Sequence, residues 1–531
     1  MLDLKSWTAL PSRLPTLPTT IEPNLPFLPA KIDVNARTVL ASLVAIYGSS
    51  ILIRALFPNR KHDTLPRAKG ALPIIGHAAA FESEPAAWLK EQFLKLGEAV
   101  SVNFAGWEVA ILGPKYVREY FAAPDAKLDF NAAVVESLAA DVTVGMGVIT
   151  NPFHITALRE RFNPLLIEKH QIVFDAMEGF VQSTIGKQMA GKVSGQPVIL
   201  DDVRDWSWRI VAKSSARCFV GEKLSDNQQL IDIFISYNGV INTAMRHYRL
   251  MPNFLKPITK YFIGRPIRQQ ETQLGAIIFP EILERQKLRH ELGDSWQAPD
   301  DMLQFLIDSR RPDGLPEPND EILSRVFALI FASMITTTFR TWQFVYDIAG
   351  NAEVQKQLYE EQLQVIAKHG TAFTKDAVSD MKLMDNCVRE SLRLSVSVFA
   401  SSRKAMQDVE FADGTQLPKG RMVMLAGYDI QRDPERYANP DEFNPSHHAG
   451  KVSTTPDRNF ILFGMGKHAC PGRFFAALEM KAALAALLRS YEFHVVEDAI
   501  SLKRCKRPAH MTKPDEMYME GSKPIAIYKR A

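Results

Sequence analysis

The stretch that decides the fold runs from Asn459 to Phe475 and reads NFILFGMGKHACPGRFF. An extended apolar run enters a loop with two glycines, presents one cysteine, and leads into a helical pattern. Pro471 suits the first helical position, which places Cys470 at the expected helix N-cap. Free amides and the positive end of the helix dipole favour a thiolate there. Such a thiolate is a ligand for a soft or borderline metal.

This loop resembles the haem-binding loop of the cytochrome P450 family, whose pattern is F-x-x-G-x-x-x-C-x-G. The residues that meet the pattern are Phe463, Gly466, Cys470 and Gly472. The resemblance implies that the Cys470 thiolate is the axial ligand of the iron of haem b. Gly464 and Gly466 lack a Cβ, so a flat ligand can lie close to the backbone, and we expect Phe463 and Gly464 to contact it. The alternative is a buried, inert cysteine.

Two other motifs suggest nucleotide binding. Residues 464–469 fit the dinucleotide fingerprint G-x-G-x-x-A, but they stand too close to the C-terminus for the repeated βαβ halves of that domain. Residues 186–192 resemble a phosphate-binding loop until Val193 replaces the hydroxyl residue that binds magnesium. They follow a helical pattern, so we interpret them as a helix end and turn. Both signals are weak, although a dinucleotide-binding dehydrogenase remains an alternative.

Composition indicates the size of the core, the kind of partner and the redox compartment. The chain has 531 residues, 46% of them hydrophobic, which is enough for a large core. A net charge of +3 gives no reason to expect a nucleic-acid partner. The four cysteines are scattered and offer neither a disulfide framework nor a zinc pair, so reduced thiols in a cytosolic environment are expected.

The N-terminal region predicts a membrane anchor. Residues 1–37 are proline-rich and are expected to be a disordered lumenal segment. Residues 38–57 are apolar and long enough to span a bilayer, although a buried core helix is the alternative. Residues 58–77 read as a basic, proline-rich hinge that places the following domain, 78–531, in the cytosol. Together with the resemblance, this predicts a single-pass protein of the endoplasmic reticulum membrane.

The sequence pattern of residues 78–531 predicts a mainly α fold with small β sheets, the P450 fold. Apolar residues at three-to-four spacing predict helices over 172–188, 203–218, 228–245, 271–292, 320–349 and 352–368. Alternating or apolar short runs predict strands over 99–104, 109–112, 409–417, 422–425 and 525–528, with the first two forming a hairpin.

The segment 320–349 is apolar nearly all round at its centre, which demands burial. Three threonines follow, and a threonine hydroxyl inside a helix can divert a backbone carbonyl and locally open the helix. The segment resembles the long central helix of the family, in which Thr336 takes the place of the threonine that hydrogen-bonds iron-bound oxygen. The resemblance therefore implies that Thr336 is catalytic. The family usually has a polar residue just before this threonine, and Ile335 breaks that pattern. The alternative for these threonines is simple helix packing.

Another family signature is an E-x-x-R pair, met here by Glu390 and Arg393. Such a pair on a helix is usually a solvated ion pair. The resemblance instead implies a buried structural network on the proximal side of the haem. Its third member is usually an arginine, and His447 stands in the corresponding place.

Arg403 and His468 occupy positions where the family places donors for the haem propionates. Paired donors of this kind suit a macrocycle that carries carboxylates, although each could be an ordinary surface charge. Lys467 and Arg473, beside the loop, are candidate docking charges for an acidic partner.

The resemblance implies a haem-thiolate monooxygenase that takes electrons from an NADPH-dependent reductase, uses O2, and hydroxylates a C–H bond. The apolar side chains Phe327, Ile330, Phe331, Met334 and Ile335 predict an apolar substrate. Fungal enzymes that oxidise terpenoids in secondary metabolism provide the closest likeness. A polyketide, sterol or fatty acid is an alternative substrate, and a haem-thiolate gas or redox sensor is an alternative function. The loop 251–257 is expected to dip into membrane lipid.

Overall fold

The computed structural model describes residues 20–21, 32–33, 65–72, 76–104, 107–250, 256–505 and 523–530. The expected anchor, residues 38–57, and most of the loop 251–257 lie outside these residues. Of the expected hinge, residues 65–72 lie against strand β3 (Ala99–Phe104), where the Ser101 amide donates to the Pro66 carbonyl over 2.9 Å.

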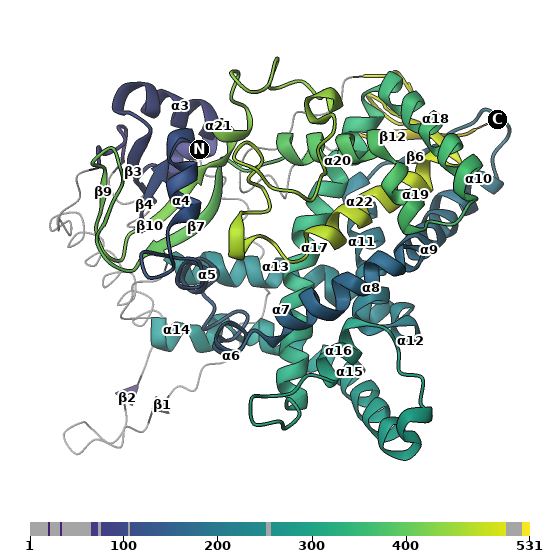
Figure 1. Cartoon of the computed structure of the whole chain (residues 1–531), viewed down its shortest axis with the longest axis horizontal. Coiled ribbons are helices and arrows are strands. Elements are labelled where there is room, and N and C mark those ends of the chain that lie inside the picture. The colour runs from purple at the N-terminus through teal and green to yellow at the C-terminus, as the bar shows by residue number, and fades with distance from the viewer. Residues whose placement is uncertain are drawn as a thin grey trace.

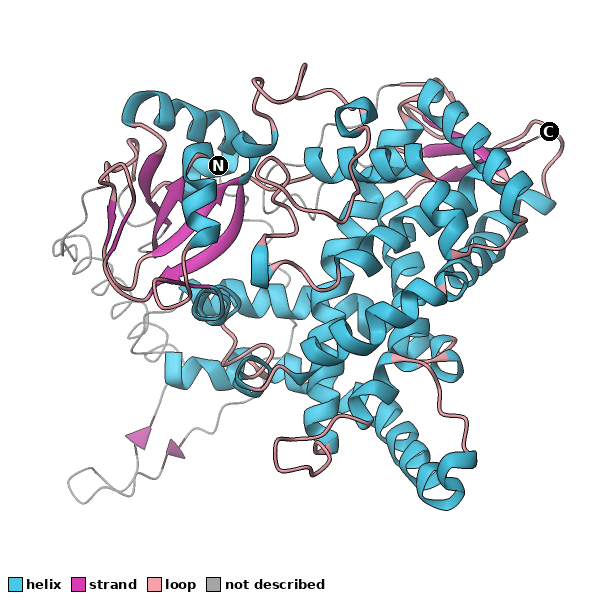
Figure 2. Ribbon diagram, in the orientation of Figure 1, coloured by secondary structure: helices cyan, strands magenta, loops and turns pink. Residues whose placement is uncertain are grey.

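Helices form most of the described chain, as the periodicity predicts (Figures 1 and 2). The helices are α2 (Ala78–Ser83), α3 (Pro85–Leu96), α4 (Val117–Ala122), α5 (Phe130–Leu138), α6 (Met146–Thr150), α7 (Phe153–Ala157), α8 (Asn163–Glu168), α9 (His170–Val181), α10 (Lys187–Ala190), α11 (Val203–Val220), α12 (Glu222–Ser225), α13 (Gln228–Leu250), α14 (Lys256–Ile263), α15 (Arg265–Leu292), α16 (Met302–Ile307), α17 (Asn319–Ala349), α18 (Ala352–His369), α19 (Lys375–Asp380), α20 (Lys382–Leu394), α21 (Gly427–Gln431) and α22 (Arg473–Leu488).

The predicted hairpin is confirmed as an edge of a five-stranded sheet with the order β3-β4-β10-β7-β5. Its strands are β3, β4 (Trp107–Leu112), β10 (Met422–Ala426), β7 (Phe399–Ala405) and β5 (Leu128–Asp129). Strand β10 runs parallel to β4 with Met422 opposite Val109, and the other pairs are antiparallel. The sheet lies at one end of the molecule, at the left of Figure 2, and brings β5 beside β7.

Smaller strand groups complete the β structure of the described residues. A three-stranded sheet has the order β11 (Tyr491–Val495), β12 (Ile525–Lys529), β6 (Val198–Leu200). The segment predicted as one strand over 409–417 is instead two short paired strands, β8 (Val409–Glu410) and β9 (Gln416–Leu417), because a turn at Gly414 reverses the chain. Strands β1 (Thr20–Ile21) and β2 (Ile32–Asp33) pair with each other.

Helix α17 runs through the middle of the molecule and packs on α11, α13, α20 and α22 (Figure 1). It is the one helix in the described part of the chain that is long and apolar enough to cross a membrane. Most of that apolar surface is buried, including Phe327, Ile330 and Met334, so here its hydrophobicity serves the core.

The start of helix α22 and the course of helix α17 differ from the sequence expectations. Helix α22 begins at Arg473 with Gly472 as its N-cap, so Pro471 is not its first residue. Pro471 instead belongs to a turn, in which the Arg473 amide donates to the Cys470 carbonyl over 3.5 Å. Helix α17 passes through its three threonines without a break. Residues 186–192 are a helix end and turn, as expected.

Candidate active site

The cysteine loop, residues 461–472, is a compact series of turns. The Gly464 amide donates to the Ile461 carbonyl over 2.8 Å, and the Cys470 amide closes the loop on Phe463. Gly464 and Gly466 both have φ near +65°, a left-handed conformation that favours glycine. A Cβ on Gly464 would lie 3.3 Å from the His468 carbonyl, whereas one on Gly466 would meet nothing within 4 Å. The open space at Gly466 fits the expected flat ligand.

Cys470 combines two properties that rarely occur together. The residue is exposed, yet burial raises the pKa of its thiol, while hydrogen bonds from the amides of Gly472 and Arg473 and the charge of Arg473 act in the opposite direction. Both properties hold if the sulfur faces a hollow inside the molecule. The amides at the helix end favour the thiolate, as expected, but without a metal cation desolvation outweighs them. A metal cation would have to supply the missing positive charge.

Helix α17 exposes one narrow stripe although it lies in the core. Ala332 and Thr336, one turn apart, are exposed, whereas Met334, Thr337 and Thr338 are buried. The Thr336 hydroxyl donates to the Ala332 carbonyl over 2.8 Å, which is the carbonyl diversion expected for a threonine inside a helix. Ala332 and Thr336 are therefore the accessible positions in this part of α17.

Arg403 and His468 come together at one carboxylate, Asp125. The imidazole Nε2 of His468 lies 2.8 Å from Asp125 Oδ1, and a guanidinium nitrogen of Arg403 lies 3.7 Å from the same oxygen. The Lys467 ammonium lies 2.7 Å from Oδ2. Burial acts to raise the pKa of Asp125, but the hydrogen bonds from Lys467 and His468 lower it.

Arg403 retains an unused donor. Its side chain is buried, and it donates to the Leu128 carbonyl over 3.0 Å, but its Nε has no hydrogen-bond partner among the residues that the structure describes. A buried donor left unpaired is unfavourable unless a ligand or water satisfies it. The carboxylates of a haem are acceptors of the type that this nitrogen requires.

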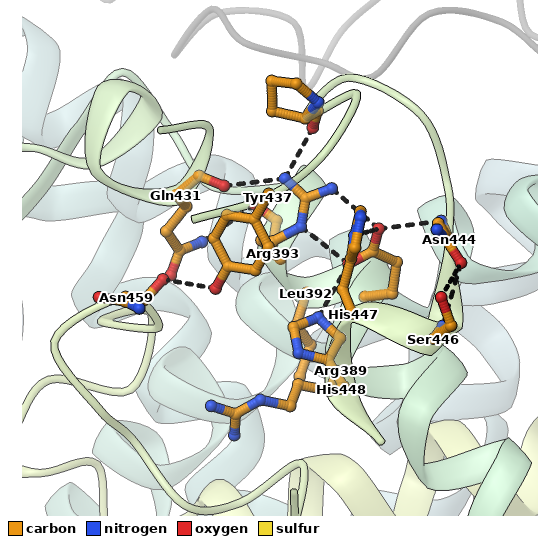
Figure 3. A network of polar contacts seen from close by, with 12 residues as sticks. Arg389, Leu392, Arg393, Gln431, Tyr437, Asn444, Ser446, His447, His448 and Asn459 are labelled. Atoms are coloured by element: carbon orange, nitrogen blue, oxygen red, sulfur yellow. Dashed lines mark hydrogen bonds and ion pairs between the residues drawn. The ribbon is translucent and has the colours of Figure 1, made fainter. Parts of the chain in front are cut away.

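Glu390 and Arg393 form a buried pair on α20. Figure 3 shows Arg393 near Gln431, His447 and His448. Two guanidinium nitrogens of Arg393 donate to the two oxygens of Glu390, each over 2.8 Å. The His447 Nδ1 approaches Glu390 Oε1 at 3.1 Å, and the His448 Nε2 approaches Oε2 at 2.8 Å. Burial acts to raise the pKa of Glu390, but the hydrogen bonds from Arg393 and His448 lower it to about 2. The carboxylate is therefore ionised.

The two histidines contact Glu390 in different ways. Both ring nitrogens of His447 face acceptors, since Nε2 lies 2.9 Å from the Ala438 carbonyl while Nδ1 faces Glu390. The Nδ1 of His448 is buried and has no hydrogen-bond partner among the described residues, and burial lowers the pKa of this residue. His447 thus occupies the place where an arginine is usual, and His448 adds a second imidazole beside the Glu390 carboxylate.

A glutamine joins this network to the cysteine loop. The Gln431 carbonyl accepts from Arg393 over 2.8 Å, and its side-chain Oε1 accepts from the Ile461 amide over 2.9 Å. Ile461 is the residue whose carbonyl starts the loop turns. Gln431, His448 and Asp125 were missed by sequence reasoning. Only His448 had a signal, its place beside His447, since the other two act across long stretches of chain.

The proposed docking charges are partly engaged within the chain. The Lys467 ammonium is paired with Asp125 but remains well exposed. The guanidinium of Arg473 donates to the Cys470 and Thr454 carbonyls and stacks on the Phe474 ring at 4.2 Å. Both side chains help to hold the loop in its conformation.

Comparison with known proteins agrees with this geometry. The family described as "Cytochrome P450" matches residues 66–520. Cytochrome P450 monooxygenase 151 of Postia placenta is 27% identical, with 89% of this chain and 96% of the relative covered. Cytochrome P450 monooxygenase 1 of Gibberella fujikuroi is 30% identical over 73% of this chain and 90% of its own length.

A solved structure shows the same fold. It is described as a retinoic acid-bound cyanobacterial CYP120A1, with a TM-score of 0.65 and 21% sequence identity. The match covers 88% of this chain and all of the other. The mainly helical architecture with small sheets is thereby confirmed.

Proposed function

The chain belongs to the cytochrome P450 family, and from this premise we propose that Cys470 ligates the haem iron of a monooxygenase acting on an apolar, terpenoid substrate. Members of the family are oxidoreductases that use haem b, O2 and electrons from a reduced partner. The observation that carries the assignment of Cys470 is that the residue is exposed although burial raises the pKa of its thiol. Its loop contacts Asp125, which also lies beside Arg403, and the Nε of Arg403 has no hydrogen-bond partner among the described residues.

Haem bound here would supply the activation of O2 and the oxidation of the C–H bond. The chain's own residues bind and orient. Arg403 and His468 would hold the haem carboxylates, Arg403 through its free Nε. Phe463 and Gly464 shape the loop that would contact the haem, and the network of Glu390, Arg393 and His447 supports that loop through Gln431.

Thr336 is the residue of α17 that we assign to proton handling. Its hydroxyl proton is donated to the Ala332 carbonyl, so its lone pairs remain available towards the accessible side of the helix. A water or a substrate hydroxyl would supply the proton, since Ile335 carries no titratable group. Glu390 and Arg393 are too fully engaged with each other to take part.

The substrate class rests on fewer residues than the sequence suggested. Phe327, Ile330 and Met334 are buried in the core, where Phe327 packs on Tyr237 with ring centroids 4.6 Å apart. Phe331 and Ile335 retain accessible surface. These two apolar side chains beside Ala332 favour an apolar substrate, for which we propose a terpenoid in a secondary-metabolite pathway.

We assign the protein to the endoplasmic reticulum membrane, with a single-pass anchor at 38–57 and a cytosolic catalytic domain. The described helix α14 supports contact with lipid, because it exposes Tyr261 and Phe262 beside Lys260. The reduced partner would be an NADPH-dependent reductase.

The test is expression of the full chain with a reductase, in a host supplied with candidate terpenoids. Haem absorbance, the spectrum of the reduced carbon monoxide complex and oxygenated products are measured. Cys470→Ser should abolish the thiolate spectrum and the product, whereas Cys505→Ser, at a partly exposed cysteine, should change neither. A serine variant at 470 that keeps the wild-type spectrum would overturn the assignment.

A second variant separates catalysis from sensing. Thr336→Ala should retain haem but release reducing equivalents as peroxide and lower product per NADPH by about tenfold or more. Unchanged coupling would mean that Thr336 only packs. A gas or redox sensor would bind haem yet give no oxygenated product with any substrate class, including polyketides, sterols and fatty acids.

A further inference from the structure

The turn between α4 and β5 presents a carboxylate to the cysteine loop. Lys127 and Leu128 amides both donate to the Pro124 carbonyl, over 2.8 and 3.0 Å, which holds Asp125 at the apex of a rigid turn. Neither Asp125 nor this turn carries any motif in the sequence. The carboxylate reaches residues 343 positions away, on the loop that carries Cys470.

Asp125 contacts two basic side chains of the loop, His468 and Lys467, at hydrogen-bonding distance. Its Oδ1 lies 2.8 Å from His468 Nε2 and its Oδ2 lies 2.7 Å from Lys467 Nζ. The Phe130 ring packs on the imidazole with centroids 5.0 Å apart. The His468 ring is therefore fixed both by a hydrogen bond at one nitrogen and by an aromatic contact on its face.

The same turn also positions Arg403. Strand β5 pairs with β7, and the Leu128 carbonyl accepts from the Arg403 guanidinium over 3.0 Å. Asp125 Oδ1 lies 3.7 Å from that guanidinium, too far for a hydrogen bond but close enough for a favourable charge interaction. Asp125 therefore lies between Arg403 on the sheet and Lys467 and His468 on the loop.

We propose that Asp125 is a positioning residue that holds Arg403, Lys467 and His468 in place for the haem carboxylates. This inference rests on the proposed haem site. When a residue that orients the side chains contacting a metal or cofactor is removed, the affinity for that metal or cofactor commonly changes by 10–100-fold. Asp125 also adds a negative charge beside the cofactor, which opposes reduction of the iron.

The test compares variants of the haem-loaded full chain. We expect Asp125→Asn to release haem to excess apomyoglobin on the order of tenfold faster than wild type and to shift the reduction potential to more positive values. Asp125→Glu should restore part of both properties. The matched control is Asp413→Asn: Asp413 is similarly exposed and also bridges neighbouring residues, Lys115 at 2.9 Å and Tyr116 at 2.6 Å, but it lies in the β8–β9 turn.

A double variant distinguishes positioning from general stability. If Asp125 acts through Lys467, the effects of Asp125→Asn and Lys467→Met on haem release are not additive. The inference would be overturned if Asp125→Asn matched wild type in haem release and reduction potential. It would also be overturned if the Asp413 control changed both properties equally. Failure of the proposed function looks different, because wild-type protein would then carry no haem at all.

Discussion

Two glutamates on neighbouring helices of the core, Glu390 on α20 and Glu479 on α22, are both fully buried but reach opposite charge states. Glu390 meets Arg393, two histidines and the Asn444 amide, and the pKa falls to about 2. Glu479 accepts from Ser215 over 3.2 Å, its Oε2 has no partner, and no cation of the described residues pairs with it. Burial raises the pKa of Glu479 to about 8.

The comparison of Glu390 with Glu479 shows that hydrogen-bonding and charged partners, rather than burial, decide whether a buried carboxyl of this protein is ionised. Desolvation acts to raise the pKa of both groups. A bidentate guanidinium overcomes it at Glu390, whereas hydroxyl groups do not overcome it at Glu479. The charged cluster supports the cysteine loop, and the neutral carboxyl joins α22 to α11.

Removing the cation from the charged cluster should have the largest effect. Arg393→Ala leaves the Glu390 carboxylate buried beside His447 and His448 alone, and should lower the free energy of unfolding by about 3–5 kcal/mol. Urea titration measures the loss, and haem content should fall with it. The control is Arg436→Ala, since Arg436 forms a partly exposed pair with Asp433 at the same i,i+3 spacing, 2.9 Å apart. Arg436→Ala should lower the free energy of unfolding by less than about 1 kcal/mol. Equal losses in the two variants would contradict the comparison.

Acid should weaken the charged cluster. The pKa of Glu390 is about 2 in the folded chain and 4.5 without the fold, so its stabilisation is present above pH 4.5 and is lost as pH falls towards 2. The contribution is about 3 kcal/mol. Urea titrations of wild type and Glu390→Gln across this range should converge at the acid end. A constant difference between the two proteins would show that Glu390 does not change its proton affinity on folding.

Replacing Glu479 with a residue that cannot ionise should stabilise the protein. Its pKa is about 8 in the folded chain and 4.5 without the fold, so the unfolded chain releases this proton first and stability declines as pH rises from 4.5 to 8. Glu479→Gln should therefore raise the free energy of unfolding by about 3 kcal/mol at pH 7 and leave it unchanged at pH 4. Glu492→Gln, at an exposed carboxylate on β11, serves as the control and should change little. Destabilisation at both pH values would mean that Glu479 has a partner as an anion.

The smallest effect is expected at the histidine that stands in for an arginine. His447→Gln can keep only one of the two contacts, to Glu390 or to the Ala438 carbonyl, and should lower the free energy of unfolding by about 1 kcal/mol. His447→Arg should preserve stability, because a guanidinium supplies donors for both acceptors. His290→Gln, at an exposed position on α15, should change nothing. A greater loss with arginine than with glutamine would contradict the assignment of His447 to the place of the usual arginine.

Local patterns were enough to predict the elements of this fold. The helices over 203–218, 320–349 and 352–368 were expected within about two residues of their observed ends, because apolar periodicity reports which face is buried. The start of α22 was placed two residues too early, since Pro471 suits a turn as well as a helix. The three buried residues of α17 expected to line the substrate site were misplaced because a core helix is apolar on every face.

By itself the sequence determined the cysteine loop, the E-x-x-R pair and the mainly helical class, all of which depend on residues close together in the chain. Only the tertiary structure decided that Asp125 meets His468, that His448 joins Glu390, and that no cation of the described residues pairs with Glu479. The physical reason is distance along the chain: spacing constrains neighbours on one helix or turn, whereas charge states in the core depend on groups that only packing brings together.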